Sequence, residues 1–216
     1  EQRATERAKP VPMPPHEPRA MPYAATRPHE YWSVDIRYLD MHTLGGSMIY
    51  CISILDNYSR AVLASIVTPV QNLTAYLLVL YSAIRNHGAP EAIVSDGGGV
   101  FKAKRAQTIY QTLGIIKHQI DPGEPWQNYI ESAFGVQRRM ADYHLAQATT
   151  WTELQDAHAR WVADYNFQDH WAHQDRADGR RSPFQVLAQH HGVDHSAPRL
   201  RPANICALHA TPAVTG

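Results

Sequence analysis

Three carboxylates stand at positions from which they could share metal ions. Asp35 lies within the apolar segment Trp32-Ser33-Val34-Asp35-Ile36, Asp96 is followed by three glycines, and Glu131 comes soon after the turn-rich segment 121–125. A charge inside an apolar strand is costly unless it is paired or bound to a cation. Two divalent ions ~3.5–4 Å apart, held by carboxylate oxygens, can clamp the attacking and leaving oxygens of a phosphate. The set therefore predicts metal-dependent phosphoryl transfer.

Each carboxylate also has an ordinary structural role open to it. Asp35 could form a buried ion pair with Arg37 or Arg60. The second carboxylate could simply begin a Gly-rich turn. Glu131 stands three residues after Asn128 and could be the reciprocal acceptor of a capping box. These alternatives stay open for each residue, but they explain the three residues together less well than a metal site does.

The elements that must position the carboxylates follow from the spacing of apolar residues. Five strands are predicted, at residues 31–40, 48–55, 60–67, 91–95 and 115–120. Helices are predicted at residues 73–86 and 101–113, from the loop at 121–125 to about 147, and after capping boxes at Thr152/Gln155 and Ser182/Gln185. An antiparallel meander followed by alternating helices and strands predicts an α/β fold. Its mixed five-stranded sheet, with meander and parallel strands flanked by helices, is that of ribonuclease H-like folds.

Four segments resemble the catalytic core of the DDE integrase/transposase family, which includes retroviral integrases and bacterial insertion-sequence transposases. They are Tyr31–Asp35, Leu55–Arg60, Val94–Phe101 and Pro125–Glu131. The 34 residues between Asp96 and Glu131 are very close to the family's characteristic spacing. Downstream, the chain looks most like bacterial insertion-sequence transposases, through Tyr165-Asn166, His170 and Arg180–Leu187. The resemblance covers about residues 31–190.

The chain departs from the family pattern at four positions near these motifs. Asn usually follows the second Asp, where this chain has Gly97, and an acidic residue is frequent where Val100 stands. The usual Gly before the catalytic Glu is Asn128, and Ser132 follows that Glu in place of Arg or Lys. None of these departures replaces one of the three carboxylates. They are expected to affect DNA contacts near the loop instead.

The resemblance implies a metal-dependent DNA transposase or integrase core, a DDE-type polynucleotidyl transferase. Such a core nicks DNA ends and joins the 3′-hydroxyl to target DNA by transesterification. It implies that Asp35, Asp96 and Glu131 are catalytic and hold two Mg²⁺ or Mn²⁺ ions. It also implies DNA as partner, both transposon ends and target, and a homo-oligomer of at least two copies. A ribonuclease H-like or junction-resolving nuclease and a catalytically silent DNA-binding or assembly domain remain as alternatives.

Some polar residues close to the motifs are predicted to contact DNA. They are Lys102, Asn128, Arg138 and Arg139. Arg138 comes seven residues after Glu131, so a helix would place both on nearly the same face. Lys102 begins the second predicted helix beside the Asp96 turn. A solvated basic surface is the alternative for each cation. Asp56 is interpreted as a turn-forming residue rather than a ligand.

The composition is that of a globular protein and argues against a membrane or secreted protein. The 216 residues include 20 Lys+Arg and 20 Asp+Glu, with 44% hydrophobic residues, which is typical of a globular chain. No apolar run approaches the ~20 residues that cross a bilayer, and no secretory leader opens the chain. We therefore expect a cytoplasmic bacterial protein, without membrane attachment, that joins the nucleoid when it acts. Neutral net charge does not exclude DNA, because residues 31–100 carry the acidic excess and residues 101–150 a basic one.

Four segments are expected along the chain. Residues 1–30 are predicted to be a Pro-rich linker or arm, residues 31–150 the catalytic core, residues 151–191 C-terminal helices packed on the core, and residues 192–216 a tail or the start of a missing C-terminal module. A structural zinc site is disfavoured, because no Cys-x-x-Cys accompanies the clustered histidines. These are His170, His173, His190, His191 and His195.

Overall fold

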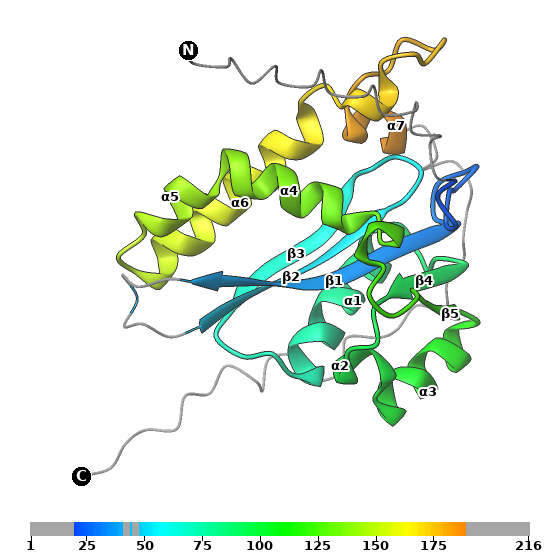
Figure 1. Ribbon diagram of the computed structural model, residues 1–216, viewed down its shortest axis with the longest axis horizontal. Coiled ribbons are helices and arrows are strands. Elements are labelled where there is room, and N and C mark those ends of the chain that lie inside the picture. Colours follow the sequence, from blue (N-terminus) through cyan, green and yellow to red (C-terminus); the bar gives the residue numbers. More distant parts are fainter. Residues whose placement is uncertain (1–19, 41–43, 45–47, 189–216) are drawn as a thin grey trace, which may run out of the picture.

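A computed structural model describes residues 20–40, 44 and 48–188, and five of its strands form one sheet (Figure 1). The strands are β1 (Tyr31–Asp40), β2 (Met48–Asp56), β3 (Val62–Thr68), β4 (Ala92–Ser95) and β5 (Ile116–Gln119). Their order is β3-β2-β1-β4-β5. The first three strands pair antiparallel, whereas β4 runs parallel to both β1 and β5. This arrangement confirms the predicted mixed sheet, and β1, which carries Asp35, is its central strand.

The described helices are α1 (Leu73–His87), α2 (Gly99–Lys102), α3 (Lys104–Leu113), α4 (Ile130–Met140), α5 (Asp142–Ala146), α6 (Trp151–Phe167) and α7 (Pro183–Ala188). Two short 3₁₀ segments are η2 (Pro125–Gln127) and η3 (Trp171–His173). Figure 1 shows α1, α2 and α3 on one side of the sheet and α4, α5 and α6 on the other. The sheet is therefore covered on both faces, as expected from the order of the elements.

Two predicted helices are each divided in two. The helix predicted at 101–113 is interrupted at Ala103, whose backbone is extended at φ −54° and ψ 136°. The long helix predicted to reach about residue 147 is interrupted at Ala141, which separates α4 from α5. Alanine has the highest intrinsic helix propensity, so tertiary packing and not local preference sets both interruptions.

The helix caps match the sequence pattern at two helices and differ at a third. Asn72 caps α1 by accepting from the backbone N–H of Ala75 at 2.9 Å, and Ser182 forms the predicted capping box before α7. The box predicted at Thr152 is wrong, because α6 begins earlier and Thr150 caps it. Thr150 and Glu153 have the same capping-box spacing, so the pattern alone permitted both positions.

Residues of β1 alternate between two hydrophobic cores. Val34 belongs to a core built with buried residues of α1 and α3. Leu39 belongs to a second core, built with buried residues of α4, α5 and α6. Because alternate residues of a strand point to opposite faces, Asp35 shares the face of Leu39. The carboxylate of Asp35 is therefore directed to the side of the sheet where α4 lies.

The described residues on either side of the core pack against it. In the segment 20–30, the Tyr23 carbonyl accepts from Asn57 Nδ2 at 3.0 Å, and the His29 N–H donates to Asp56 Oδ1 at 2.7 Å. At the other end, α6 packs against β3 and α7. Residues 1–19 and the predicted tail at 192–216 lie outside the described residues, so the four-segment division stays a prediction.

Asp56 lies at the end of β2 and organises the turn to β3. It is fully buried and accepts from the N–H and the hydroxyl of Ser59, both at 2.7 Å, besides the N–H of His29. These contacts confirm its interpretation as a turn-forming residue.

In the described part of the chain, no helix is both long enough and apolar enough to cross a membrane.

Candidate active site

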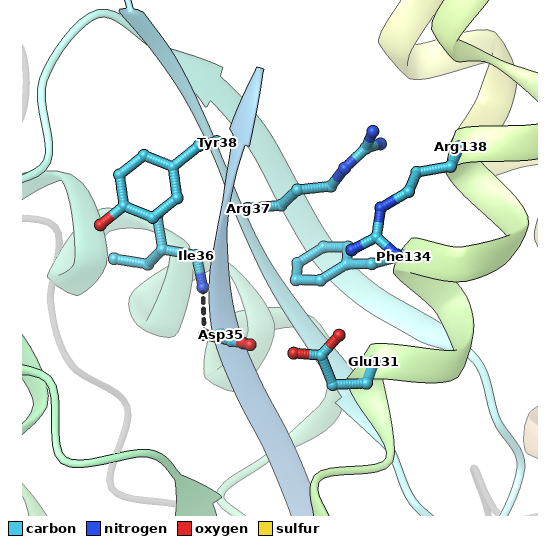
Figure 2. Close-up of a pocket in the computed structure, with 7 residues that line it drawn as sticks. All are labelled: Asp35, Ile36, Arg37, Tyr38, Glu131, Phe134 and Arg138. Atoms are coloured by element: carbon cyan, nitrogen blue, oxygen red, sulfur yellow. Dashed lines mark hydrogen bonds between the residues drawn. The ribbon is translucent and has the colours of Figure 1, made fainter. Parts of the chain in front are cut away.

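Asp35 and Glu131 line the same pocket, between the middle of β1 and the first turns of α4. The pocket encloses about 370 Å³ and is lined by Asp35, Ile36, Arg37 and Tyr38 of β1 and by Glu131, Phe134 and Arg138 of α4. Figure 2 shows the two carboxylates pointing toward one another across the gap between strand and helix. The helical spacing of Glu131 and Arg138 places both on the face that looks into the pocket, as their separation in the sequence predicts.

The carboxyl group of Asp35 is half-buried and lies near other negative charges. Burial, and then the nearby carboxylates of Asp96 and Glu131, raise the pKa of Asp35 to about 7. A hydrogen bond from the Ile36 N–H to Asp35 Oδ1 at 2.7 Å opposes this rise. No salt bridge to Asp35 occurs within the described ranges. The environment therefore penalises the ionised carboxylate and leaves its charge uncompensated.

Neither arginine that could have neutralised Asp35 does so. Arg37 donates instead to Asp142 Oδ1 and to Gln137 Oε1, each at 2.8 Å. The guanidinium of Arg60 lies 3.9 Å above the centre of the Tyr129 ring. The ion-pair alternative for Asp35 is thus not formed in this structure.

Asp96 approaches the site from the neighbouring strand. Val94 of β4 pairs with Ser33 of β1 in parallel register, so Asp96, two residues beyond Val94, lies level with Asp35. The Asp96 Oδ1 atom accepts from the Gly98 N–H at 2.9 Å, so this residue does form the Gly-rich turn. It does not line the pocket shared by Asp35 and Glu131, but its charge acts on Asp35.

Glu131 has no capping role. Helix α4 begins at Ile130 without a side-chain cap, and the Glu131 backbone N–H donates to the Asn128 carbonyl at 3.1 Å. The side chain is free to point toward Asp35, whose pKa it raises both through its charge and through a hydrogen bond. The capping-box alternative is therefore excluded by the geometry.

The donor atoms fit a hard divalent cation by their chemistry. Three carboxylates supply only oxygen ligands, as Mg²⁺ and Mn²⁺ prefer. Their uncompensated charge around the half-buried Asp35 is what a bound cation would relieve. Within residues 20–40, 44 and 48–188, however, no group of three or more His, Cys, Asp or Glu side chains is close enough to form a complete metal site. The pair Asp35–Glu131 faces one pocket, and Asp96 lies beside it.

Histidines near the C-terminal helices are engaged in the fold. His173 Nε2 lies 2.8 Å from the Ser59 carbonyl oxygen, and His170 Nδ1 accepts from the Ala172 N–H at 3.2 Å. The other three histidines considered for zinc, His190, His191 and His195, lie outside the described residues.

The four residues predicted to contact DNA differ in exposure. Lys102, Arg138 and Arg139 are exposed. The prediction for Asn128 is corrected by its position, because this residue is only 2% exposed and its Nδ2 donates to the Val34 carbonyl at 3.2 Å. A side chain buried against the central strand positions the start of α4 and is not available to DNA.

The sequence reasoning considered Arg37 only as an ion-pair partner of Asp35, and it did not single out Lys117. Arg37, whose side chain is 9% exposed, ties β1 to α4 and α5. Lys117 of β5 lies within electrostatic range of Asp96. Arg37 carried a signal, since a charged residue two positions after Asp35 in an apolar strand shares its face. No local pattern distinguished Lys117.

The fold and the site together define a class of protein. A mixed five-stranded sheet with helices on both faces is the ribonuclease H-like architecture of integrase catalytic cores. Residues 25–125 match the model of the integrase core domain family.

Two curated relatives belong to bacterial insertion elements. The 31.7 kDa protein of insertion element IS407 from Burkholderia multivorans is 28% identical over 144 residues, which cover 65% of this chain and 50% of the relative. The 39.2 kDa protein of insertion element IS476 from Xanthomonas euvesicatoria is 27% identical over 146 residues, covering 66% of this chain and 41% of the relative. The chain thus spans half or less of the length of these relatives.

Solved structures share the fold at low sequence identity. The HTLV-2 integrase catalytic core domain in complex with magnesium matches with a TM-score of 0.60 and 15% identity, over 75% of this chain and 98% of that one. A chain of the simian T-cell lymphotropic virus intasome matches with a TM-score of 0.64 and 18% identity, over 92% of this chain and 64% of that one. The solved structures show that the chain has the fold of integrase catalytic cores. The family model and the insertion-element relatives show that its sequence is similar to integrase core domains and to proteins of bacterial insertion elements.

Proposed function

We propose that this chain is the catalytic core of a metal-dependent DNA transposase or integrase. Asp35, Asp96 and Glu131 would hold the metal ions, and the reaction would nick DNA ends and join them to target DNA. The alternative activities on the same fold, a ribonuclease H-like or junction-resolving nuclease, cut without joining.

One observation carries this proposal, namely the uncompensated negative charge on the half-buried Asp35. Its carboxyl group faces Glu131 and lies near Asp96, and no salt bridge in the described part of the chain offsets it. A fold would not gain stability from such an arrangement, because each carboxylate disfavours ionisation of the next. A site that binds divalent cations accounts for the cost, since the cations restore charge balance when they bind.

Each carboxylate has a distinct structural support for this role. Asp35 is fixed by its position in the central strand, and Glu131 by the first turns of α4. Asp96 stands on a short turn, where its Oδ1 already accepts from Gly98. Two carboxylates on rigid elements and a third on a turn would allow the metal site to close when cations and DNA bind.

The chemistry proposed is an exchange of phosphodiester bonds. A hydroxyl oxygen, from water in nicking or from a DNA 3′ end in joining, forms a new bond to phosphorus while the bond to the leaving 3′-oxygen breaks. Two bound Mg²⁺ or Mn²⁺ ions would supply activation of the nucleophile and stabilisation of the leaving oxygen. Because one phosphodiester replaces another in joining, no nucleotide cofactor is needed. The protein's part is to position the groups and exclude competing geometries.

Exposed cations around the pocket are suited to the DNA backbone. Arg138 lines the pocket beside Glu131, and Arg139 follows it on the exposed surface of α4. Arginine binds phosphate oxygens in a bidentate manner. We propose DNA as the partner and a homo-oligomer as the working assembly.

The test is a strand-cutting and strand-joining assay on labelled DNA with Mg²⁺ or Mn²⁺. Asp96→Asn should abolish both products while the protein melts like the unsubstituted chain. Asp164→Asn is the matched control, since it removes an exposed carboxylate on α6, far along the chain from the three proposed ligands. Full strand joining by Asp96→Asn would overturn the assignment. Cutting without joining would indicate a nuclease, and DNA binding without cutting would indicate a catalytically silent domain.

A further inference from the structure

Arg60 has a strained backbone in the turn between β2 and β3. Its φ of 63° lies in the left-handed region, which among the described residues other than glycine it shares only with His29. A residue with a Cβ is disfavoured there, and Gly or Asn is the usual occupant of such a turn position. The turn is organised by Asp56, which accepts from Ser59, and this contact does not require an arginine. The reason for an arginine at this position must therefore lie in its side chain.

The guanidinium of Arg60 lies 3.9 Å above the centre of the Tyr129 ring. Arg60 is half-buried, and within residues 20–40, 44 and 48–188 its guanidinium has no hydrogen bond and no salt bridge. Burial lowers the pKa of Arg60, and the charge of Asp56 opposes this effect from beyond salt-bridge distance. The face of the Tyr129 ring, where a cation is attracted to the π electrons, is thus its direct partner in this part of the chain.

Tyr129 is the N-cap residue of α4 and stands two positions before Glu131. It is 5% exposed, and no side-chain hydrogen bond caps the N-terminus of this helix. Side-chain caps ordinarily help to fix the first turn of a helix, so contacts with other elements must fix it here. The preceding Asn128 supplies one such contact, because its Nδ2 donates to the Val34 carbonyl of β1 at 3.2 Å. The Tyr129 ring beneath Arg60 supplies a second.

Two anchors at consecutive residues determine how α4 leaves the preceding loop. A helix held at one point can pivot about it, whereas contacts with two different elements, β1 and the β2–β3 turn, fix both its position and its direction. The Glu131 side chain leaves the first turn of this helix and points toward Asp35 across the pocket (Figure 2). A change of direction at Tyr129 therefore changes the separation of the two carboxylates, on which a metal site depends closely.

We propose that Arg60 is a positioning residue for the metal site, because its contact with the Tyr129 ring holds the first turn of α4 so that Glu131 faces Asp35. This role explains why a half-buried cation occupies a strained turn position that Gly or Asn would fill more easily. The inference deepens the proposed function and rests on it, since it takes the two facing carboxylates as metal ligands.

The test is calorimetric titration of the whole chain with Mn²⁺. Arg60→Gln should weaken Mn²⁺ binding by about tenfold, the lower end of what the loss of an outer support costs a metal site. The sign of this change is diagnostic, because removal of a positive charge would by electrostatics alone tighten the binding of a cation. Arg160→Gln is the matched control, since it removes an exposed arginine of α6 and should not weaken Mn²⁺ binding. Arg60→Lys, which restores a cation over the ring, should recover most of the affinity.

Further variants separate the ring contact from the folding of the turn. Arg60→Asn suits the left-handed backbone and so preserves the turn, but it lacks the guanidinium and should bind Mn²⁺ as weakly as Arg60→Gln does. Tyr129→Phe keeps an aromatic face and should bind Mn²⁺ more tightly than Tyr129→Leu. Thermal unfolding of each protein establishes that it is folded. Folded Arg60→Gln and Arg60→Asn proteins with the Mn²⁺ affinity of Arg160→Gln would overturn the positioning role.

Other outcomes separate this role from a DNA contact and from the proposed function. The affinity for a short labelled DNA duplex in EDTA should be the same for Arg60→Gln and Arg160→Gln. A loss of DNA affinity specific to Arg60→Gln, with Mn²⁺ affinity intact, would make Arg60 a phosphate contact instead. If the unsubstituted chain binds Mn²⁺ and joins DNA strands while the Arg60 variants bind Mn²⁺ equally well, the positioning role alone is overturned. If the unsubstituted chain neither binds Mn²⁺ nor cuts DNA, the positioning role and the proposed function are both overturned.

Discussion

Arg37 and Gln137 join the strand that carries Asp35 to the helix that carries Glu131. Arg37 Nη1 donates to Gln137 Oε1 at 2.8 Å, and the same guanidinium binds both carboxylate oxygens of Asp142 at the start of α5. Gln137 is fully buried. The contact therefore fixes the distance between β1 and α4 nearly two helical turns beyond Glu131.

Replacement of Arg37 should loosen this connection. Arg37→Met leaves the buried Gln137 carbonyl without its donor and Asp142 without its cation. We expect a loss of about 2 kcal/mol in the free energy of unfolding, the partial exposure of Asp142 holding the cost below that of a fully buried pair. Urea denaturation measures this loss of unfolding free energy. Arg37→Lys, which keeps one donor, should lose less, and a Met variant as stable as the unsubstituted chain would contradict the account.

Removal of a proposed metal ligand should stabilise the protein in the absence of metal. Asp35→Asn eliminates a half-buried charge whose ionisation Asp96 and Glu131 oppose. In EDTA at neutral pH we expect its free energy of unfolding to rise by about 1–3 kcal/mol. Added Mg²⁺ should stabilise only the unsubstituted chain. A variant that is less stable in EDTA would show that Asp35 has a favourable partner in the fold.

Acid should destabilise the protein partly through His158. Burial lowers the pKa of His158 to about 4, whereas the unfolded chain titrates near 6.5. Between these values the unfolded state binds more protons, so the stabilisation is complete above pH 6.5 and is lost as the pH falls toward 4. In His158→Gln, the loss of unfolding free energy between pH 6.5 and pH 4 should be smaller by about 2–3 kcal/mol. Urea denaturation at a series of pH values measures the slope, and an unchanged slope would contradict the burial of a neutral imidazole.

Asp56 should act on stability and not on metal binding. Asp56→Ala removes the acceptor for three hydrogen bonds in the turn between β2 and β3. We expect a loss of about 2–4 kcal/mol in the free energy of unfolding, with Mg²⁺ affinity unchanged in the folded fraction. Asp56→Asn keeps one acceptor oxygen, so its free energy of unfolding should lie between those of the unsubstituted chain and Asp56→Ala. A variant that melts normally but has lost Mg²⁺ binding would make Asp56 a ligand.

The sheet was accessible from the sequence because its strands are apolar and its turns carry strong signals. The predicted 31–40 coincides with β1, and the other strands differ at their ends by at most two residues. Asp35 was recognisable because a carboxylate stands out in an apolar strand. The interruptions at Ala103 and Ala141 were not, because alanine favours helix and only packing explains them.

The details of the site depend on contacts between distant parts of the chain. Arg37 and Asp142 are 105 residues apart, and no local pattern pairs them. Asn128 was predicted to contact DNA, whereas the fold buries it and its Nδ2 donates to the Val34 carbonyl. The extension of a short strand, β5, beside β4 is what brings Lys117 to Asp96. Such pairings follow from sheet order and register, which the sequence specifies only through the whole fold.

The central claim is that Asp35, Asp96 and Glu131 act as one metal site. The most direct measurement is calorimetric titration of the chain with Mn²⁺, in parallel with Glu131→Gln and with Asp164→Asn as the control that removes a remote carboxylate. The account predicts Mn²⁺ binding by the unsubstituted chain and by the control, and its loss in Glu131→Gln. Equal Mn²⁺ binding by all three proteins, or none by the unsubstituted chain, would contradict it.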